Sequence, residues 1–218
     1  MDRLINDFNK LYPAFEAKHI VGKDIVITEH ENEGKPNTFK ELTIKNVTGW
    51  EFSRDFLEST KAFHNSAQDT AFTIRTCHEI MTRECDGMFC TEDNNRIIFH
   101  LFELKSTFST DNLAKAKDQI TGSYLKLLHL IAPLQSFSRK NITMCGHIII
   151  YEPDTERLSS IKSLTDPKSR FSIRIHDSKR YDMPADKCSR YWHPLICPDI
   201  NLNLVEVPYG TISHQITL

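Results

Sequence analysis

Three charged residues in the middle of the sequence have types and spacing that could support a reaction. Glu103 and Lys105 end an almost continuous apolar run at 96–105. Side chains alternate along a strand, so these two point to the same face if the run is a strand. Two opposite charges at the end of a buried strand are costly to desolvate unless they serve each other or a ligand. Asp86 lies seventeen residues before Glu103 and opens a second short apolar stretch.

These residue types suit the hydrolysis of a phosphodiester bond. Two carboxylates hold a hard divalent cation by oxygen, and magnesium keeps its remaining positions for water and phosphate oxygens. Such a cation polarises the phosphate and lowers the pKa of a bound water. A lysine beside that water can orient or activate it, and can also offset negative charge. Asp86, Glu103 and Lys105 therefore predict an active site that uses Mg²⁺ or Mn²⁺.

A β-hairpin is needed to bring Asp86 to Glu103. Residues 87–91 and 96–105 read as two strands, and the Glu-Asp-Asn-Asn segment between them is a plausible turn. Ser109 or Thr110 can then cap a helix that runs to about residue 131, and 144–151 reads as another buried strand. Together with a strand at 72–76, this order favours an α/β fold with a mixed central β-sheet flanked by helices.

The flanking segments give weaker patterns. Helical spacing is seen at 3–19, interrupted by a proline, and at 53–68, whereas 25–28 and 42–47 read as short strands. Beyond residue 151, further strands are expected at 171–176 and 202–207, separated by a polar and irregular stretch. We expect a single domain over 1–218, with its core motif region at about 72–151 and a C-terminal extension at 152–218.

The central residues, taken in order, resemble the PD-(D/E)XK nuclease superfamily. Asp86, then Glu103-x-Lys105 at the end of the next strand, stand in the spacing of the superfamily motif. Gln119 follows on the next helix, where many branches carry a glutamine or lysine that reaches towards the metal site or the DNA. This stretch is similar to bacterial members of the superfamily, and the resemblance covers about residues 72–151, roughly a third of the chain. It implies a restriction-endonuclease-like αβββαβ core.

The resemblance also implies individual roles. Asp86 and Glu103 would be metal ligands, and the backbone carbonyl of Leu104 would be a third. Lys105 would position or activate the attacking water, and Gln119 would be an auxiliary residue. Cys85 stands where the name-giving proline would be, a departure that is frequent in the superfamily.

A further acidic ligand is common upstream in the superfamily, at a position that varies. Glu79 and Glu58 are the candidates in this sequence, and Glu79 is preferred because it is nearer to Asp86.

Each of these residues also has an interpretation without an active site. Glu103 and Lys105 could be a solvated ion pair at a strand end, and Asp86-Gly87 could simply be a turn. Gln119 could border the apolar stripe of its helix. An acid, a hairpin-length gap, a buried strand, the Glu-x-Lys triplet, a capped helix and a glutamine in this order favour the active site.

The charge distribution gives a second, weaker indication. The formal net charge of −2 carries no global signal for nucleic-acid binding, but residues 157–192 hold nine Lys/Arg against four Asp/Glu, interleaved with aromatic residues. This mixture suits phosphate contacts with some base stacking. The alternative is a solvated basic surface whose aromatic residues belong to the core. The residues expected to contact phosphate are Lys168, Arg170, Lys179, Arg180 and Arg190.

The six cysteines show no compact disulfide framework. Cys188, His193 and Cys197 could supply zinc ligands, as could the group Cys77, His78, Cys85 and Cys90. Neither set has a paired Cys-x-x-Cys spacing, so scattered, partly buried thiols are the favoured interpretation. The sequence has no apolar run of about 18 residues and no hydrophobic signal core at its start, so we expect a soluble cytoplasmic protein without a membrane partner.

Taken together, these patterns predict a divalent-metal-dependent endonuclease, with DNA favoured over RNA. A restriction or anti-phage defence setting follows by analogy with small bacterial members, with a homodimer or a target-recognising partner protein as the expected assembly. The first alternative is a catalytically silent nuclease-like domain used as a binding or assembly module. The second is a zinc-stabilised protein-interaction domain.

Overall fold

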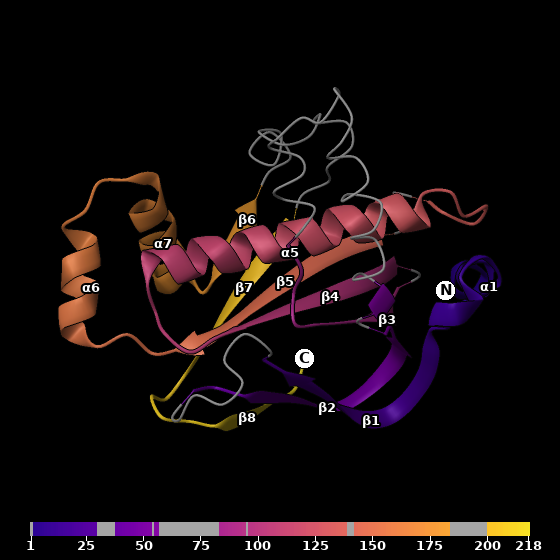
Figure 1. Cartoon of the computed structure of the whole chain (residues 1–218), viewed down its shortest axis with the longest axis horizontal. Coiled ribbons are helices and arrows are strands. Elements are labelled where there is room, and N and C mark those ends of the chain that lie inside the picture. Colours follow the sequence, from indigo (N-terminus) through magenta and orange to yellow (C-terminus); the bar gives the residue numbers. More distant parts are fainter. Residues whose placement is uncertain are drawn as a thin grey trace.

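The computed structural model contains a mixed β-sheet with helices packed against it (Figure 1). Predictions that fall on residues 57–82, including the strand at 72–76, lie outside the described part of the chain. None of the helices in that part combines the length and apolarity that a membrane span needs. The structure describes residues 2–29, 38–53, 55–56, 83–94, 96–138, 142–183 and 200–218.

Within the described residues, eight strands form the sheet, in the order β1-β2-β3-β4-β5-β7-β6, with β8 paired to β2. Strands β4, β5 and β7 are parallel to one another, as β8 is to β2, and the other neighbours are antiparallel. A mixed sheet with flanking helices was predicted, and this is confirmed. The strands are β1 (Lys18–Thr28), β2 (Glu41–Glu51), β3 (Gly87–Asp93), β4 (Arg96–Lys105), β5 (Ile142–Tyr151), β6 (Arg180–Met183), β7 (Ile200–Val207) and β8 (Ser213–Ile216).

The helices begin at recognisable caps. The side chain of Ser109 accepts a hydrogen bond from the Asn112 backbone N–H and caps α5, as predicted. Asp154 caps α6 in the same way, and Asp166 caps α7, whose first residue is a proline. The helical elements are α1 (Asp2–Leu11), the 3₁₀ turn η1 (Pro13–Phe15), α5 (Thr110–Ile131), α6 (Thr155–Lys162) and α7 (Pro167–Ser178).

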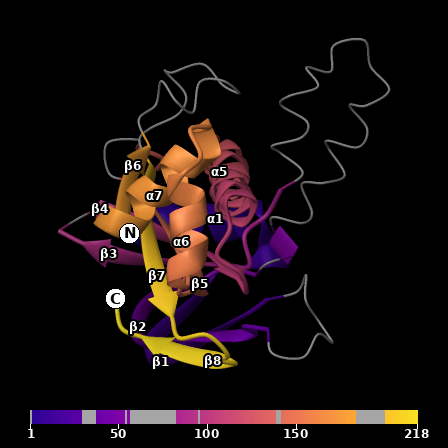
Figure 2. The same ribbon diagram turned by 90° about the vertical axis from the view of Figure 1, so that its left-hand side faces the viewer.

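Strand β4 is buried on both faces, which explains its nearly continuous apolar sequence. On one face, Phe99 and Leu101 pack in a cluster with Leu113 and Ile120 of α5. On the other face, Phe102 belongs to a second cluster with apolar residues of β1 and β2. Strand β2 pairs with β3 only near its end, so β1, β8 and most of β2 fold over this second face (Figure 2). The end of β4 therefore lies between two layers.

One predicted element is wrong, and another is confirmed only in part. The helical spacing at 3–19, interrupted by a proline, gives a helix up to Leu11, but its last residues lie in β1, which begins at Lys18. The predicted strand at 171–176 lies within α7, where the Asp166 cap and Pro167 start a helix. Its Phe171 and Ile175 are one turn apart and both buried, so the apolar alternation that suggested a strand also fits a helical face.

Candidate active site

The predicted hairpin is present, and its register brings Asp86 to Glu103. Gly87 pairs with Phe102 across the β3–β4 ladder. Just outside this ladder, the Asp86 backbone N–H donates to the Phe102 carbonyl at 2.8 Å. Asp86 therefore lies at the end of the hairpin, next to the last residues of β4.

The carboxylate of Asp86 is fixed to the backbone of β4. Its Oδ2 accepts a hydrogen bond from the Leu104 N–H at 2.8 Å, and the residue is 7% exposed. Leu104 thus contacts Asp86 through its amide, while the metal-binding role expected of its carbonyl stays a prediction. A carboxylate held by a backbone N–H keeps its position without depending on a flexible partner.

Glu103 and Lys105 form a buried ion pair. The Lys105 Nζ lies 2.5 Å from Glu103 Oε1, and the two side chains are 4% and 0% exposed. The interpretation as a solvated pair at a strand end is therefore wrong. Both residues continue the β4 face that packs against α5, as their alternation predicted. Removing water from this pair strengthens its electrostatic interactions and those of any ion placed beside it.

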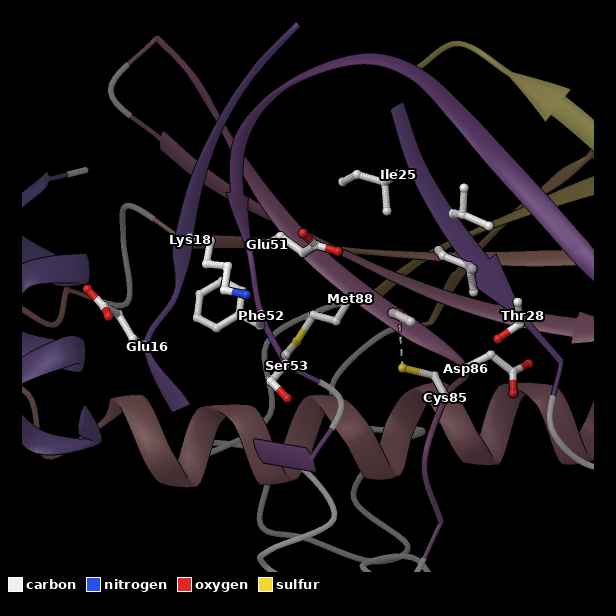
Figure 3. Close-up of a pocket in the computed structure, with 13 residues that line it drawn as sticks. Glu16, Lys18, Ile25, Thr28, Glu51, Phe52, Ser53, Cys85, Asp86 and Met88 are labelled. Carbon is white, nitrogen blue, oxygen red and sulfur yellow. Dashed lines mark hydrogen bonds between the residues drawn. The ribbon is translucent and has the colours of Figure 1, made fainter. Parts of the chain in front are cut away.

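Asp86 also lines a surface cavity of about 340 Å³. Figure 3 shows Asp86 and Cys85 at one end of this cavity, and Glu16 and Lys18 at the other. The cavity lies between β1, the end of β2 and the start of β3; Glu103 and Lys105 do not line it. A Cβ atom at position 87 would lie 2.7 Å from Ile27 Cγ1, so glycine lets β1 pass close to the strand beside Asp86.

Helix α5 holds the residues that precede Asp86. Gln119 Nε2 donates to the Glu84 carbonyl at 3.0 Å, and the Ser123 hydroxyl accepts from the Cys85 N–H at 2.7 Å. Lys126 Nζ lies 2.6 Å from Glu84 Oε1, with side-chain exposures of 0% and 6%. Gln119 was predicted as an auxiliary residue, whereas Glu84, Ser123 and Lys126 were missed. A lysine between two leucines in a buried helix was the available signal.

Gln119 lies close to the candidate site, and its side chain contacts the backbone carbonyl of Glu84. The residue is 6% exposed, and its Oε1 atom has no hydrogen-bond partner among the described residues. This buried acceptor is compatible with the auxiliary role that the resemblance implies, since a buried polar atom is costly without a donor.

The thiols of the described residues are held in their neutral form by burial. Burial raises the pKa of Cys85 to about 12, and the nearby Glu103 and Asp86 carboxylates add to this effect. Burial also raises the pKa of Cys90 and Cys145, and none of the three forms a disulfide with another described residue. Neutral thiols are poor zinc ligands and poor nucleophiles. The other residues considered for zinc, at 77–78 and 188–197, lie outside the described residues.

The donor set for a divalent cation consists of oxygen atoms. Asp86 and Glu103 supply two carboxylates, which are the ligands that Mg²⁺ and Mn²⁺ prefer. The described ranges contain no group of three or more His, Cys, Asp or Glu residues that could hold a metal ion. Glu79 and Glu58, the candidates for a further acidic ligand, are outside those ranges. The two observed carboxylates fit a hard cation by chemical type.

The predicted phosphate contacts are mostly engaged with acidic partners. Lys168 lies 2.6 Å from Asp111, Lys179 lies 2.6 Å from Glu206, and Arg180 lies 2.9 Å from Asp182. The basic side chains in these pairs are 50–59% exposed, so each pair is weak and could open to a phosphate.

Two other predicted contacts complete that set. Arg170 on α7 donates to the Thr165 carbonyl at 2.9 Å, and Arg190 lies outside the described residues.

The opposite face of the sheet contains a different group of buried titratable residues. His100 Nδ1 and His147 Nε2 are 3.1 Å apart, and Thr91 Oγ1 lies 3.1 Å from His100 Nε2. The His147 ring stacks on Phe102 with centroids 4.5 Å apart. Burial lowers the pKa of His100 to about 4 and that of His147 to about 3. Both rings are therefore neutral at physiological pH.

Because the comparisons with known proteins found no match, the function is argued from the fold and from the geometry of the site. Family models, curated protein sequences and solved structures were each compared with the chain, and no match was found.

Proposed function

We propose that this chain is a divalent-metal-dependent nuclease with Asp86, Glu103 and Lys105 in its active site. The observation that carries the proposal is the burial of two carboxylates and one ammonium at the end of the β3–β4 hairpin. Asp86 is fixed to the Leu104 amide, and Lys105 to Glu103. The described order is α1, β1 to β4, α5 and β5; its β2–β4, α5 and β5 part is compatible with the βββαβ portion of a restriction-endonuclease-like core, to which β1 is an addition.

The residues divide the work of the reaction between them. Asp86 and Glu103 would hold Mg²⁺ or Mn²⁺ by oxygen, with the Leu104 carbonyl as a third ligand. The ion would supply Lewis-acid stabilisation of the phosphate and a more acidic bound water. Lys105 would orient or activate that water and offset negative charge. Gln119, next to the segment that leads into Asp86, would be the auxiliary residue.

The substrate and setting rest on the resemblance to the superfamily. DNA is favoured over RNA, with endonucleolytic cleavage in a restriction or anti-phage defence setting in the cytoplasm. A homodimer would place two active sites on a duplex, and a partner protein could supply target recognition. Lys168, Arg170, Lys179, Arg180 and Arg190 would contact the nucleic-acid backbone.

One observation favours a second candidate, a catalytically silent domain used as a binding or assembly module. The 2.5 Å pair of Glu103 with Lys105 gives each charge a partner within the fold, so the pair does not require a ligand. A silent domain would keep this pair for structure, bind no divalent cation and cleave no nucleic acid.

A cleavage assay separates the two candidates. The full chain would be incubated with double- and single-stranded DNA and with RNA, with Mg²⁺ or Mn²⁺ and with EDTA. We expect EDTA-sensitive cleavage by the wild type and none by the Glu103→Ala, Lys105→Ala double variant. The matched control is the Lys45→Ala, Asp24→Ala variant, which removes an exposed 2.7 Å ion pair between β1 and β2. Equal cleavage by both double variants, or no cleavage with any metal, would contradict the proposal.

A further inference from the structure

Three side chains on one face of α5 hold the two residues that precede Asp86. Gln119, Ser123 and Lys126 stand at helical spacings of four and three residues, so they are neighbours on the helix surface. They contact the carbonyl of Glu84, the amide of Cys85 and the carboxylate of Glu84, respectively. We call these three residues the α5 clamp.

The Lys126–Glu84 contact is unusual for its burial. Lys126 is fully buried within α5, and the Glu84 side chain is 6% exposed. Apolar side chains of similar volume at two such positions are commonly as stabilising as a buried ion pair, or more so. Stability alone therefore does not account for this pair. What the pair does supply is a short, directional contact that fixes the position of Glu84 relative to α5.

The contacts of Glu84 and Cys85 with α5 also restrain Asp86, the next residue along the chain. Glu84 and Cys85 are tied to α5, and the next residue, Asp86, is tied to β4 through its amide and its carboxylate. The distance from the Asp86 carboxylate to Glu103 is thus set from both sides. Misplacement of a reacting or ligand group by about 1 Å can cost roughly 100-fold in rate.

We propose that Ser123 and Lys126 are positioning residues, which set the place of the Asp86 carboxylate through Glu84 and Cys85. The catalytic consequence rests on the proposed nuclease function, whereas the positioning itself does not. Groups that hold metal ligands in place commonly contribute about 10- to 100-fold to metal affinity or activity.

The test uses variants of the full chain that remove the contacts of the α5 clamp without leaving a buried charge. The Lys126→Met, Glu84→Met variant replaces both charged side chains with apolar ones of similar length. Ser123→Ala removes the acceptor for the Cys85 amide, and Ser123→Thr restores a hydroxyl. Ile131→Val is the matched control, because Ile131 is also buried on α5 but lies beyond the clamp.

Two measurements are made on each variant. The first is hydrogen exchange of the Leu104 amide by NMR, which reports whether the Asp86 carboxylate still accepts its hydrogen bond. The second is the Mn²⁺ concentration that gives half-maximal cleavage. We expect about tenfold faster exchange at Leu104, with the rest of β4 unchanged, and a half-saturating Mn²⁺ concentration about 10- to 100-fold higher. Ser123→Thr and Ile131→Val should behave like the wild type.

The outcomes separate the clamp from the nuclease function. Unchanged exchange at Leu104 in the Lys126→Met, Glu84→Met variant and in Ser123→Ala would overturn the positioning role. Faster exchange with an unchanged Mn²⁺ requirement and turnover would overturn the catalytic consequence, because the carboxylate would then move without effect on cleavage. A wild type that neither binds Mn²⁺ nor cleaves would overturn the nuclease function, and the Leu104 amide would still decide whether the clamp holds Asp86.

Discussion

Strand β4 carries buried polar side chains on both of its faces, and the two faces stabilise them by different means. Towards α5, Glu103 and Lys105 are buried as a charged pair, with Glu84 and Lys126 as a second pair nearby. On the opposite face, His100 is buried beside another histidine, and both have pKa values well below 6.5 because of burial. The face towards α5 holds buried charged side chains, whereas the histidines on the opposite face are neutral.

The difference indicates where a reaction can be supported. Buried charge is tolerated only with close partners, so the carboxylates towards α5 are held in defined positions beside an ammonium. Fixed carboxylates of this kind can bind a cation without much reorganisation. The neutral histidines form hydrogen bonds and stack on aromatic rings, which stabilises the sheet but supplies no charge. In the proposed nuclease, catalysis would therefore belong to the α5 face.

The largest effect is expected when one member of the second charged pair is removed. Lys126→Met leaves the Glu84 carboxylate buried without its ammonium partner, which should destabilise the fold by about 3–5 kcal/mol. Adding Glu84→Met should recover most of that loss. Urea unfolding of both variants measures the difference. Equal stability of the single and double variants would mean that this pair is not buried in solution.

The next effect concerns activity. Glu103→Gln keeps the shape of the side chain but removes its charge, and we expect turnover with Mn²⁺ to fall by about 10²- to 10³-fold. His100→Phe, on the opposite face of the same strand, should leave turnover unchanged. Steady-state cleavage rates of folded variants test this contrast, and a comparable loss in both would break the assignment of catalysis to one face.

The neutral histidines predict a pH dependence of stability. Their folded-state pKa values, about 4 for His100 and about 3 for His147, lie below the ordinary 6.5. Between these values the unfolded chain binds more protons than the fold, so stability is complete above pH 6.5 and falls as the pH is lowered. Each histidine can contribute up to about 1.4 kcal/mol per pH unit.

Urea unfolding between pH 7.5 and 5 measures this slope. The His100→Phe, His147→Phe variant keeps the aromatic stack and removes both titrating groups, so its stability should vary less over the same range. A slope as steep as that of the wild type would show that other groups bind the protons.

The smallest effect is expected at the surface. Lys168→Ala breaks the ion pair with Asp111, whose side chains are 58% and 79% exposed. Water screens this pair, so the free energy of unfolding should change by less than about 1 kcal/mol. Thermal unfolding of Lys168→Ala and of Lys126→Met compares the two stability losses. A much larger loss in Lys126→Met would show that burial, rather than pairing itself, sets the contribution of an ion pair.

The parts of the structure that were predictable are encoded locally. The β3–β4 hairpin, β4 and α5 each show a continuous pattern with a turn or cap at its end, and Asp86, Glu103 and Lys105 all belong to the hairpin. The α7 helix was not predicted because Phe171, Ile173 and Ile175 alternate as a strand would, and the only local signal for a helix is the Asp166-Pro167 cap. Strand β1 is mostly exposed and has too few buried residues to reveal its length.

The contacts that position the site were not predictable. Lys126 and Glu84 are 42 residues apart, and nothing in either local sequence identifies the other as its partner. Sequence periodicity shows that residue 126 lies near a buried helical face, but the charge that neutralises it is defined only by tertiary packing.

Divalent-cation binding tests the central claim most directly. Titration calorimetry with Mn²⁺ would be performed on the wild type, on Asp86→Asn and on His100→Phe. The account predicts a site in the wild type that is retained in His100→Phe and lost in Asp86→Asn. Binding of Mn²⁺ to Asp86→Asn with the wild-type affinity, or no binding to the wild type, would contradict it.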